Sequence, residues 1–274
     1  MQAVALTIAG SDPSGGAGIQ GDLKTFHQFG VYGEAVITLL TVQNTRDVSR
    51  IEMTPADLVV EQINAVLTDV PPAAAKTGAL GSIEIVEAVA ELAKSFTFPL
   101  VVDPVMISKH GARLISPEAE QALKTKLLPC ASLATPNVPE AEALTGITIR
   151  TEKDMETAGQ RLRELGSKAA LIKGGHLPGN AVDILSAPGL VKRFSTSRIQ
   201  TRHTHGTGCT YAAAITAGLA IGNPLEEAIR IAKEFLQAAI ETAPGLGAGC
   251  GPVNHFARLS GVATPLRYKV GDKR

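Results

Sequence analysis

The sequence has few of the residues that would form a stacking surface, a disulfide framework or a membrane span. It contains no tryptophan and only 4% aromatic residues, which argues against a surface that stacks bases or sugars. Its three cysteines show no C-x-x-C spacing, so we expect neither a disulfide framework nor a structural zinc site. The same cysteine usage predicts a location in the reducing cytoplasm. No apolar run is long enough to cross a bilayer.

The chain also lacks an excess of charge of either sign. Its 274 residues include 26 lysines and arginines and 26 aspartates and glutamates, so nothing points to a nucleic-acid or membrane partner. The apolar run 3–9 has no basic region before it and is interrupted by Gly10, Ser11 and Asp12. It therefore predicts a strand rather than a signal peptide.

Short runs rich in valine, isoleucine, alanine and leucine alternate with helical patterns along most of the chain. The predicted strands are residues 3–9, 35–42, 73–79, 100–102, 132–135 and 169–173, with a hairpin of 182–185 and 191–194. The predicted helices are residues 18–29, 55–68, 83–94 (capped by Ser82), 117–127, 139–144, 151–165, 206–221 and 225–242. This alternation predicts an α/β fold, a three-layer αβα sandwich with a mostly parallel central sheet. We expect one domain over residues 1–258 and a loosely ordered extension over residues 259–274.

Polar and glycine-rich segments follow the predicted strands at their carboxyl ends. They are residues 10–18, Gln43 with Asn44, Asp103, residues 137–140 and residues 174–176. Open parallel sheets bind ligands outside the carboxyl ends of their strands. The convergence of these segments therefore predicts an enzyme active site.

The most informative segment is HGTGCT, residues 205–210, which leads into an apolar helix. Glycines let an anion approach the unpaired N–H groups at a helix start. The candidates for such an anion hole are Gly206, Thr207 and Gly208. Cys209 lies in the first turn, where the helix dipole favours a thiolate. By itself the pattern allows a packing cysteine, a covalent nucleophile beside His205, or a general base for a hydroxyl.

Other motifs narrow the choice of chemistry. Gly16, Gly18 and Gly21 have the spacing of a dinucleotide fingerprint, but they begin six residues beyond Gly10, and no acidic residue ends the second strand. A cysteine phosphatase would need an arginine after Cys209, and none is there. The chain has no Walker lysine motif either, so a phosphotransferase with this sequence is not a P-loop enzyme.

Three charged residues at element ends could serve a phosphate site. Asp103, held extended by Pro104, could bind Mg²⁺ or form an Asx turn. Glu140 could share that ion or simply place favourable charge in a first helical turn. Lys173 could contact a phosphate as a point charge, or be a solvated lysine before a turn.

In combination, these segments resemble the ribokinase superfamily, and within it the hydroxymethylpyrimidine/phosphomethylpyrimidine kinases of thiamin biosynthesis. The resemblance covers about residues 3–256. It is carried by AGSDPSGGAG (9–18), VQNT (42–45), TPNVPE (135–140), KGGH (173–176), HGTGCT (205–210) and GPV (251–253). It implies a ribokinase-like fold and phosphorylation, by ATP with Mg²⁺, of 4-amino-5-hydroxymethyl-2-methylpyrimidine and then of its monophosphate. It also implies a cytoplasmic homodimer.

The resemblance implies roles for individual residues as well. Cys209 stands where the superfamily usually has a catalytic aspartate, so it would act as the base. Gln43 would hydrogen-bond the pyrimidine, and Asp103 and Glu140 would lie near Mg²⁺. Further substrate contacts are implied at Gly10, Asp22 and Val105, and nucleotide contacts at Lys173, Asn137 and Thr207.

Four alternatives stay open on the sequence. A pyridoxal kinase shares the fold and takes a similar hydroxymethyl heterocycle. A hydroxyethylthiazole kinase also tends to carry cysteine at this position, but the region of Gln43 fits it less well. A non-catalytic nucleotide-binding protein would bind ATP without forming product. A thiol hydrolase would form a covalent adduct on Cys209 and need no ATP.

Overall fold

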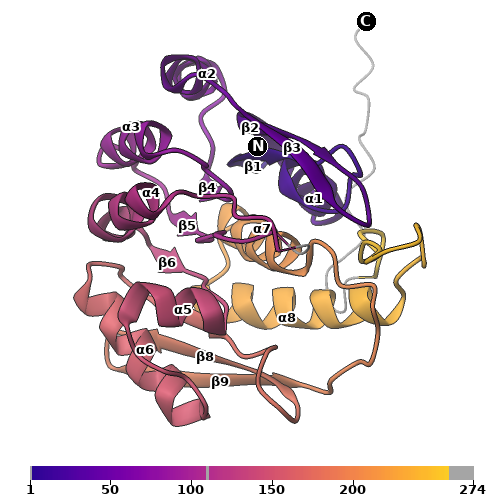
Figure 1. Cartoon of the computed structure of the whole chain (residues 1–274). Helices are drawn as coiled ribbons and strands as arrows, with labels where there is room; N and C mark the ends of the chain where they lie inside the picture. Colours follow the sequence, from indigo (N-terminus) through magenta and orange to yellow (C-terminus); the bar gives the residue numbers. More distant parts are fainter. Residues whose placement is uncertain (1, 109–110, 259–274) are drawn as a thin grey trace, which may run out of the picture.

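A single mixed sheet runs through the computed structural model, which describes residues 2–108 and 111–258 (Figure 1). The strand order is β3-β2-β1-β4-β5-β6-β7-β8-β9. The strands are β1 (Val4–Ser11), β2 (Tyr32–Gln43), β3 (Val48–Met53), β4 (Ala74–Thr77), β5 (Leu100–Val102), β6 (Leu133–Ala134), β7 (Ala170–Lys173), β8 (Ala181–Ala187) and β9 (Leu190–Thr196). The six central strands, β2, β1, β4, β5, β6 and β7, are parallel to one another. Strand β3 at one edge and strands β8 and β9 at the other pair antiparallel.

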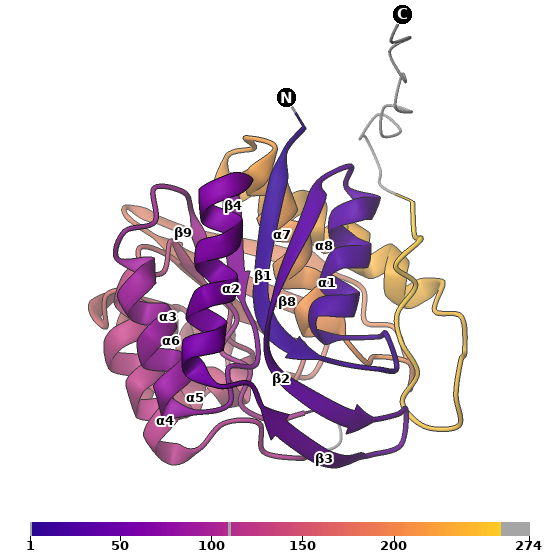
Figure 2. The ribbon, with the colours of Figure 1, turned by 90° about the horizontal axis from the view of Figure 1, so that it is seen from above.

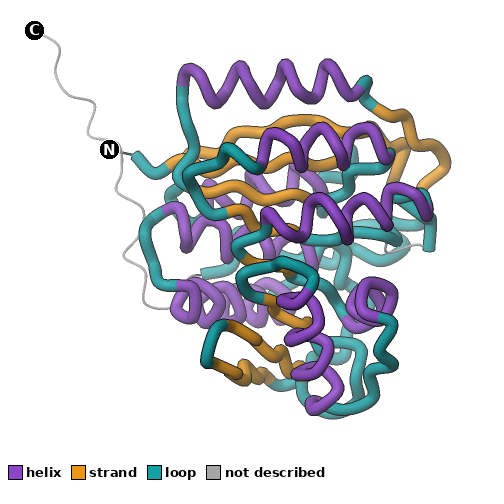
Figure 3. The backbone as a smooth tube through the Cα atoms, turned by 90° about the vertical axis from the view of Figure 1, so that its left-hand side faces the viewer, coloured by secondary structure: helices purple, strands orange, loops and turns teal. Residues whose placement is uncertain are grey.

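Helices cover both faces of this sheet (Figures 1 and 2). They are α1 (Gly18–Gln28), α2 (Ala56–Asp69), α3 (Ile83–Ala93), α4 (Pro117–Ala122), α5 (Val138–Thr145), α6 (Glu152–Glu164), α7 (Thr207–Ala220) and α8 (Leu225–Glu241). Helices α1, α7 and α8 lie on one face and α2 to α6 on the other, where Figure 3 shows helices in front of the strands. The predicted three-layer sandwich is confirmed.

Each face of the sheet has its own apolar core. Ile63, Val86 and Leu123 belong to the core under α2 to α6, whereas Phe26 and Phe235 belong to the core under α1, α7 and α8. Because parallel strands are buried on both faces, their sequences form continuous apolar runs. Burying one such large side chain contributes about 1.5–3 kcal/mol.

Most predicted elements are present within a few residues of their predicted bounds, and two differences are larger. Ser82 caps α3, and Thr151 forms a capping box with Asp154 at the start of α6, as predicted. Strand β3 was not predicted, because it is an edge strand with a mostly exposed, polar sequence. The helix predicted over residues 117–127 ends as α at Ala122 and continues as a π-helical turn.

The two remaining expectations concern the chain as a whole. No helix among the described residues is long and apolar enough to cross a membrane. The predicted loose extension, residues 259–274, lies outside the described residues.

Candidate active site

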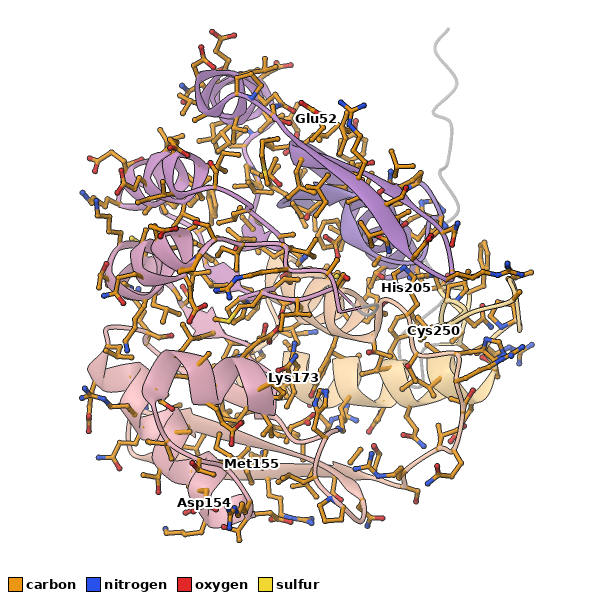
Figure 4. The ribbon with its side chains drawn as sticks, viewed as in Figure 1. Glu52, Asp154, Met155, Lys173, His205 and Cys250 are labelled. Atoms are coloured by element: carbon orange, nitrogen blue, oxygen red, sulfur yellow. The ribbon has the colours of Figure 1, made fainter. Side chains whose placement is uncertain are left out.

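A cavity of about 920 Å³ lies where the polar segments after the parallel strands meet the start of α7. Most of the predicted site residues line it: Gly10, Gln43, Asp103, Val105, Asn137, Glu140, Lys173 and residues 206–209. In Figure 4, Lys173 and His205 lie in the central part of the molecule, whereas Glu52 and Asp154 lie near its periphery. The carboxyl ends of the parallel strands and the start of α7 thus bring together residues more than 160 positions apart in the sequence.

The start of α7 is built around a glycine that no other residue could replace. Gly206, the residue before the helix, has φ 80° and ψ 4°, a left-handed conformation. A Cβ there would collide with the carbonyl oxygen of Gly16. The backbone of α7 can therefore approach the N-terminal loop closely, and its first turn faces the cavity through Thr207 and Gly208.

Asp12 organises the loop opposite α7, a role that the sequence analysis did not assign. Its carboxylate accepts hydrogen bonds from the backbone of Ser14, Gly16 and Ala17, and lies 2.7 Å from Nε2 of His205. Burial acts to raise the pKa of Asp12, but the hydrogen bonds of His205 and Ser14 outweigh it, so the pKa is below its usual value. The Asp-Pro-Ser turn in the sequence was the available signal.

The same histidine connects this loop to the predicted pyrimidine-binding residue. Nε2 of His205 lies 3.3 Å from Nε2 of Gln43, as well as 2.7 Å from Asp12. Because the Asp12 carboxylate can only accept, Nε2 of His205 donates its hydrogen to Asp12, and the Gln43 amide lies beside that hydrogen bond. The arrangement supports a structural role for His205 rather than the nucleophile–base pairing with Cys209 that a thiol hydrolase requires.

An ion-pair cluster forms the other wall of the cavity. Nζ of Lys173 donates to Oδ1 of Asp103 at 2.8 Å, and Thr135 donates to the same oxygen at 3.0 Å. Burial acts to lower the pKa of Lys173, but Asp103 and Glu140 raise it, so the side chain stays charged. The lysine is 13% exposed, which leaves it accessible to an anionic ligand.

Glu140 and Asn137 are held by each other as a capping box at the start of α5. The backbone N–H of Asn137 donates to Glu140 at 2.8 Å, and the backbone N–H of Glu140 donates to the Asn137 side chain at 2.9 Å. Burial raises the pKa of Glu140 to about 7, with Lys173 opposing the rise and Asp103 adding to it. The side-chain oxygen of Asn137 is thus already used in capping the helix.

These carboxylates suit a metal ion that arrives with other ligands. The described residues contain no group of three or more histidine, cysteine, aspartate or glutamate side chains that could hold a metal. Mg²⁺, however, usually keeps several waters and takes one or two carboxylates together with substrate phosphates. Asp103 and Glu140 are carboxylates that line the same cavity, so as a donor set they fit such an ion.

Cys209 lines the cavity, but its charge state differs from the sequence-based expectation. A base or nucleophile requires a lowered thiol pKa, and the helix start was expected to lower it. Instead, burial raises the pKa of Cys209 to about 12, while Lys76 and the backbone N–H of Gly18 act against the rise. Desolvation therefore exceeds the effect of the helix terminus.

Asp22 is the predicted site residue that lies outside the cavity lining. It is fully buried and accepts hydrogen bonds from Lys76 and Thr7, each at 2.7 Å. Direct contact between Asp22 and the substrate stays a prediction. The sequence analysis did not single out Lys76. The available signal was a lysine within a short strand, where a charged side chain must be buried.

Comparison with known proteins gives a consistent result. The family model described as phosphomethylpyrimidine kinase matches residues 12–254. The chain is 46% identical over 260 residues to the hydroxymethylpyrimidine/phosphomethylpyrimidine kinase of Staphylococcus aureus, a match covering 93% of this chain and 94% of that one. It is 51% identical over 253 residues to the thiamine biosynthesis bifunctional protein ThiED of Geobacter sulfurreducens. This second match covers 92% of this chain but only 52% of that protein, so the chain spans about half its length.

The fold is also found in a solved kinase with a bound nucleotide. The chain superposes on the Bacillus subtilis pyridoxal kinase, solved as an ADP complex, with a TM-score of 0.86 and 38% sequence identity. The match covers 94% of this chain and 98% of that one. The ribokinase-like fold is therefore confirmed.

Proposed function

The chain belongs to the phosphomethylpyrimidine kinase family, and on this basis we propose that it uses ATP to phosphorylate hydroxymethylpyrimidine and then its monophosphate, in thiamin biosynthesis. The observation that carries this proposal is the shared cavity. The cysteine-bearing start of α7 and the Asp103–Lys173 pair line the same space, together with Gln43. A phosphate acceptor and a nucleotide phosphate can therefore meet there.

Phosphoryl transfer depends mainly on positioning and charge neutralisation. Gln43 would orient the aminopyrimidine, because an amide side chain can both donate and accept. Lys173, with the backbone N–H groups of residues 206–208, would stabilise charge on the transferring phosphoryl group. Asp103 and Glu140 would hold Mg²⁺, which supplies further neutralisation of phosphate charge when bound.

Cys209 would take the proton of the substrate hydroxyl. As the hydroxyl oxygen forms its bond to the γ-phosphorus, the bond from that phosphorus to the bridging oxygen breaks and ADP leaves. In a loose transition state the attacking hydroxyl becomes acidic only late in bond formation. Sγ of Cys209 would accept that proton as a thiolate, after the thiol has released its own proton to water. Burial raises the pKa of this thiol to about 12 in the unliganded protein and so opposes that release.

Pyridoxal is a second candidate substrate. It is favoured by the structural match to a pyridoxal kinase at 38% identity. Pyridoxal and the pyrimidine alcohol are both flat heterocycles that carry a hydroxymethyl group. We further propose that the protein is cytoplasmic, that it forms a homodimer, and that residues 1–258 are the catalytic unit; sedimentation of the full chain tests the dimer.

One parallel kinase assay tests the function. The pyrimidine alcohol, its monophosphate and pyridoxal are supplied separately with ATP and Mg²⁺, and the products are identified by phosphorus NMR. We expect the two pyrimidines to be the better substrates by kcat/KM, and a preference for pyridoxal would overturn the assignment.

The role of Cys209 is tested in the same assay with Cys209→Ala. We expect loss of turnover by a factor of about 100 or more with ATP binding retained, since general-base catalysis contributes about 10²–10⁴-fold. Cys250→Ala is the matched control, because Cys250 lies in a loop after α8. Turnover of Cys209→Ala close to that of the control would remove Cys209 from the base role.

A further inference from the structure

A fully buried ion pair lies behind the cavity wall and takes no part in the mechanism described so far. Nζ of Lys76, on β4, is 2.7 Å from Oδ2 of Asp22, on α1, and both side chains are 0% exposed. Thr7 on β1 donates to the same oxygen at 2.7 Å. The other oxygen, Oδ1 of Asp22, is buried without a hydrogen-bond partner. A buried pair with an unsatisfied oxygen is costly to stability, which calls for an explanation in function.

The backbone connects this pair to Cys209. The backbone N–H of Gly18, the first residue of α1, acts on the thiol of Cys209 and favours a lower pKa. Asp22 lies four residues after Gly18, one helical turn further along the same face of α1. Helix α7, which carries Cys209, packs against both α1 and β4. Cys209, in the first turn of α7, therefore lies near the first turn of α1, and Asp22 lies one turn further along α1.

Lys76 also reaches the cavity wall from behind. A Cβ placed on Gly78 would lie 3.4 Å from Nζ of Lys76. Gly78 itself lines the cavity that Cys209 faces. Nζ of Lys76 therefore lies close behind the backbone of Gly78, which is part of the cavity lining.

Four charged groups act on the Cys209 thiol. Lys76 has the largest effect favouring the thiolate, and Asp22 and Asp103 oppose it. Lys173, on β7, is the second nearby cation, and its pKa is itself raised by Cys209 among other groups. Lys173 is partly exposed, so a ligand phosphate can replace Asp103 as its partner. Lys76 is fully buried, so it keeps Asp22 as its partner. Its charge therefore remains directed at Cys209 when nucleotide binds.

We propose that Lys76, anchored by Asp22, is a positioning residue that supplies the fixed positive charge needed for Cys209 to accept the substrate proton. This inference rests on the proposed function for the identity of the proton acceptor. Asp22 anchors the ammonium group and also weakens its effect on the cysteine. Removing the lysine charge and removing the carboxylate charge must therefore affect the thiol in opposite directions.

The test measures the thiol directly, without substrate. Iodoacetamide modification of Cys209 is followed by peptide mass spectrometry in the full chain between pH 7 and 10. For Lys76→Met we expect alkylation about tenfold slower at each pH, since one unit of thiol pKa changes the thiolate fraction tenfold. For Asp22→Asn we expect faster alkylation than in the unmodified chain.

Two further variants make the result decisive. Lys126→Met, which breaks an exposed pair with Glu87, is the matched control and should leave the rate unchanged. The double variant Lys76→Met with Asp22→Asn removes both charges and should alkylate at a rate between those of the two single variants. If the single variant Asp22→Asn does not fold, the double variant must still alkylate faster than Lys76→Met alone.

The outcomes separate this inference from the proposed function. Equal alkylation in Lys76→Met and the control, or slowing by both charge-removing variants, would show a merely structural pair and overturn the inference. In turnover, we expect the acidic limb of the kcat pH profile, on which kcat rises with pH, to move to higher pH for Lys76→Met, with little change in KM for ATP. If alkylation shifts as expected while Cys209→Ala retains turnover, the proton acceptor has been misassigned and the proposed mechanism fails instead.

Discussion

Two lysine–carboxylate pairs flank the start of α7, and they differ in burial rather than in chemistry. Lys173 pairs with Asp103 at 2.8 Å on the cavity wall, where the lysine is 13% exposed. Lys76 pairs with Asp22 at 2.7 Å behind that wall, and neither side chain is exposed. A pair at a cavity can exchange a partner for a ligand, whereas a fully buried pair acts only as a fixed field and as a structural element. We therefore expect substitution of Lys173 to reduce mainly the activity, and substitution of Lys76 to reduce mainly the stability.

The largest effect is expected on activity, from the pair in the cavity. In Lys173→Met we expect kcat/KM for ATP to fall about 10²–10³-fold, the size of losing one preorganised partner of the transferring group. The melting temperature should change less than in Lys76→Met, since water can reach Asp103 through the cavity. Steady-state kinetics with thermal unfolding measures both. Lys192→Met, an exposed lysine paired with Glu226, is the control; a loss of kcat/KM equal to that of this control would contradict the comparison.

The next effect is expected on stability, from the buried pair. Lys76→Met leaves Asp22 without its cation, and breaking a buried pair in this way costs about 3–5 kcal/mol of unfolding free energy. Replacing both residues, as in Lys76→Met with Asp22→Leu, should recover much of that loss because no buried charge remains. Urea unfolding at pH 7 gives the two values. A double variant no more stable than Lys76→Met would mean that packing, not charge, sets the cost.

The smallest effect concerns pH, and it distinguishes the surroundings of the two pairs. Burial raises the pKa of Glu140, beside the cavity pair, from 4.5 to about 7. The folded state therefore binds a proton more tightly than the unfolded chain. The resulting stability is present in full below about pH 4.5 and is lost as the pH rises through about 7, by at most on the order of 3 kcal/mol.

Comparison of unfolding free energies at pH 5 and pH 8 isolates this contribution. The unmodified chain should lose more stability between the two values than Glu140→Gln does, since glutamine has no proton to lose and can still accept the Asn137 N–H. His255, whose pKa burial lowers to about 4, destabilises both chains equally on the acid side. Identical pH dependence in the two chains would remove Glu140 as the titrating group.

Much of the fold followed from local pattern. The predicted strand 100–102 coincides with β5, and Ser82 caps α3 as expected. Apolar runs and caps are local signals, so they survive without knowledge of the tertiary contacts. Strand β3 was missed because its pairing with β2 at the sheet edge is not encoded in an apolar alternation.

Part of the candidate site could also be predicted from local sequence patterns. Asp103 and Lys173 could be proposed because each ends a predicted parallel strand, and such ends share one edge of the sheet. Asp12 and Lys76 could not be assigned roles in this way. Each acts through a partner far away in the chain, His205 for Asp12 and Asp22 for Lys76.

The sequence alone therefore determined the alternation of strands and helices, the glycine-rich start of α7 and the placement of Cys209 in its first turn. Only the tertiary structure decided the charge state of that cysteine. Burial raises its pKa to about 12 despite the helix terminus, and the cation that most opposes this rise, Lys76, comes from strand β4, far away in the sequence. Desolvation and charge act through space, so both depend on which segments the fold brings together.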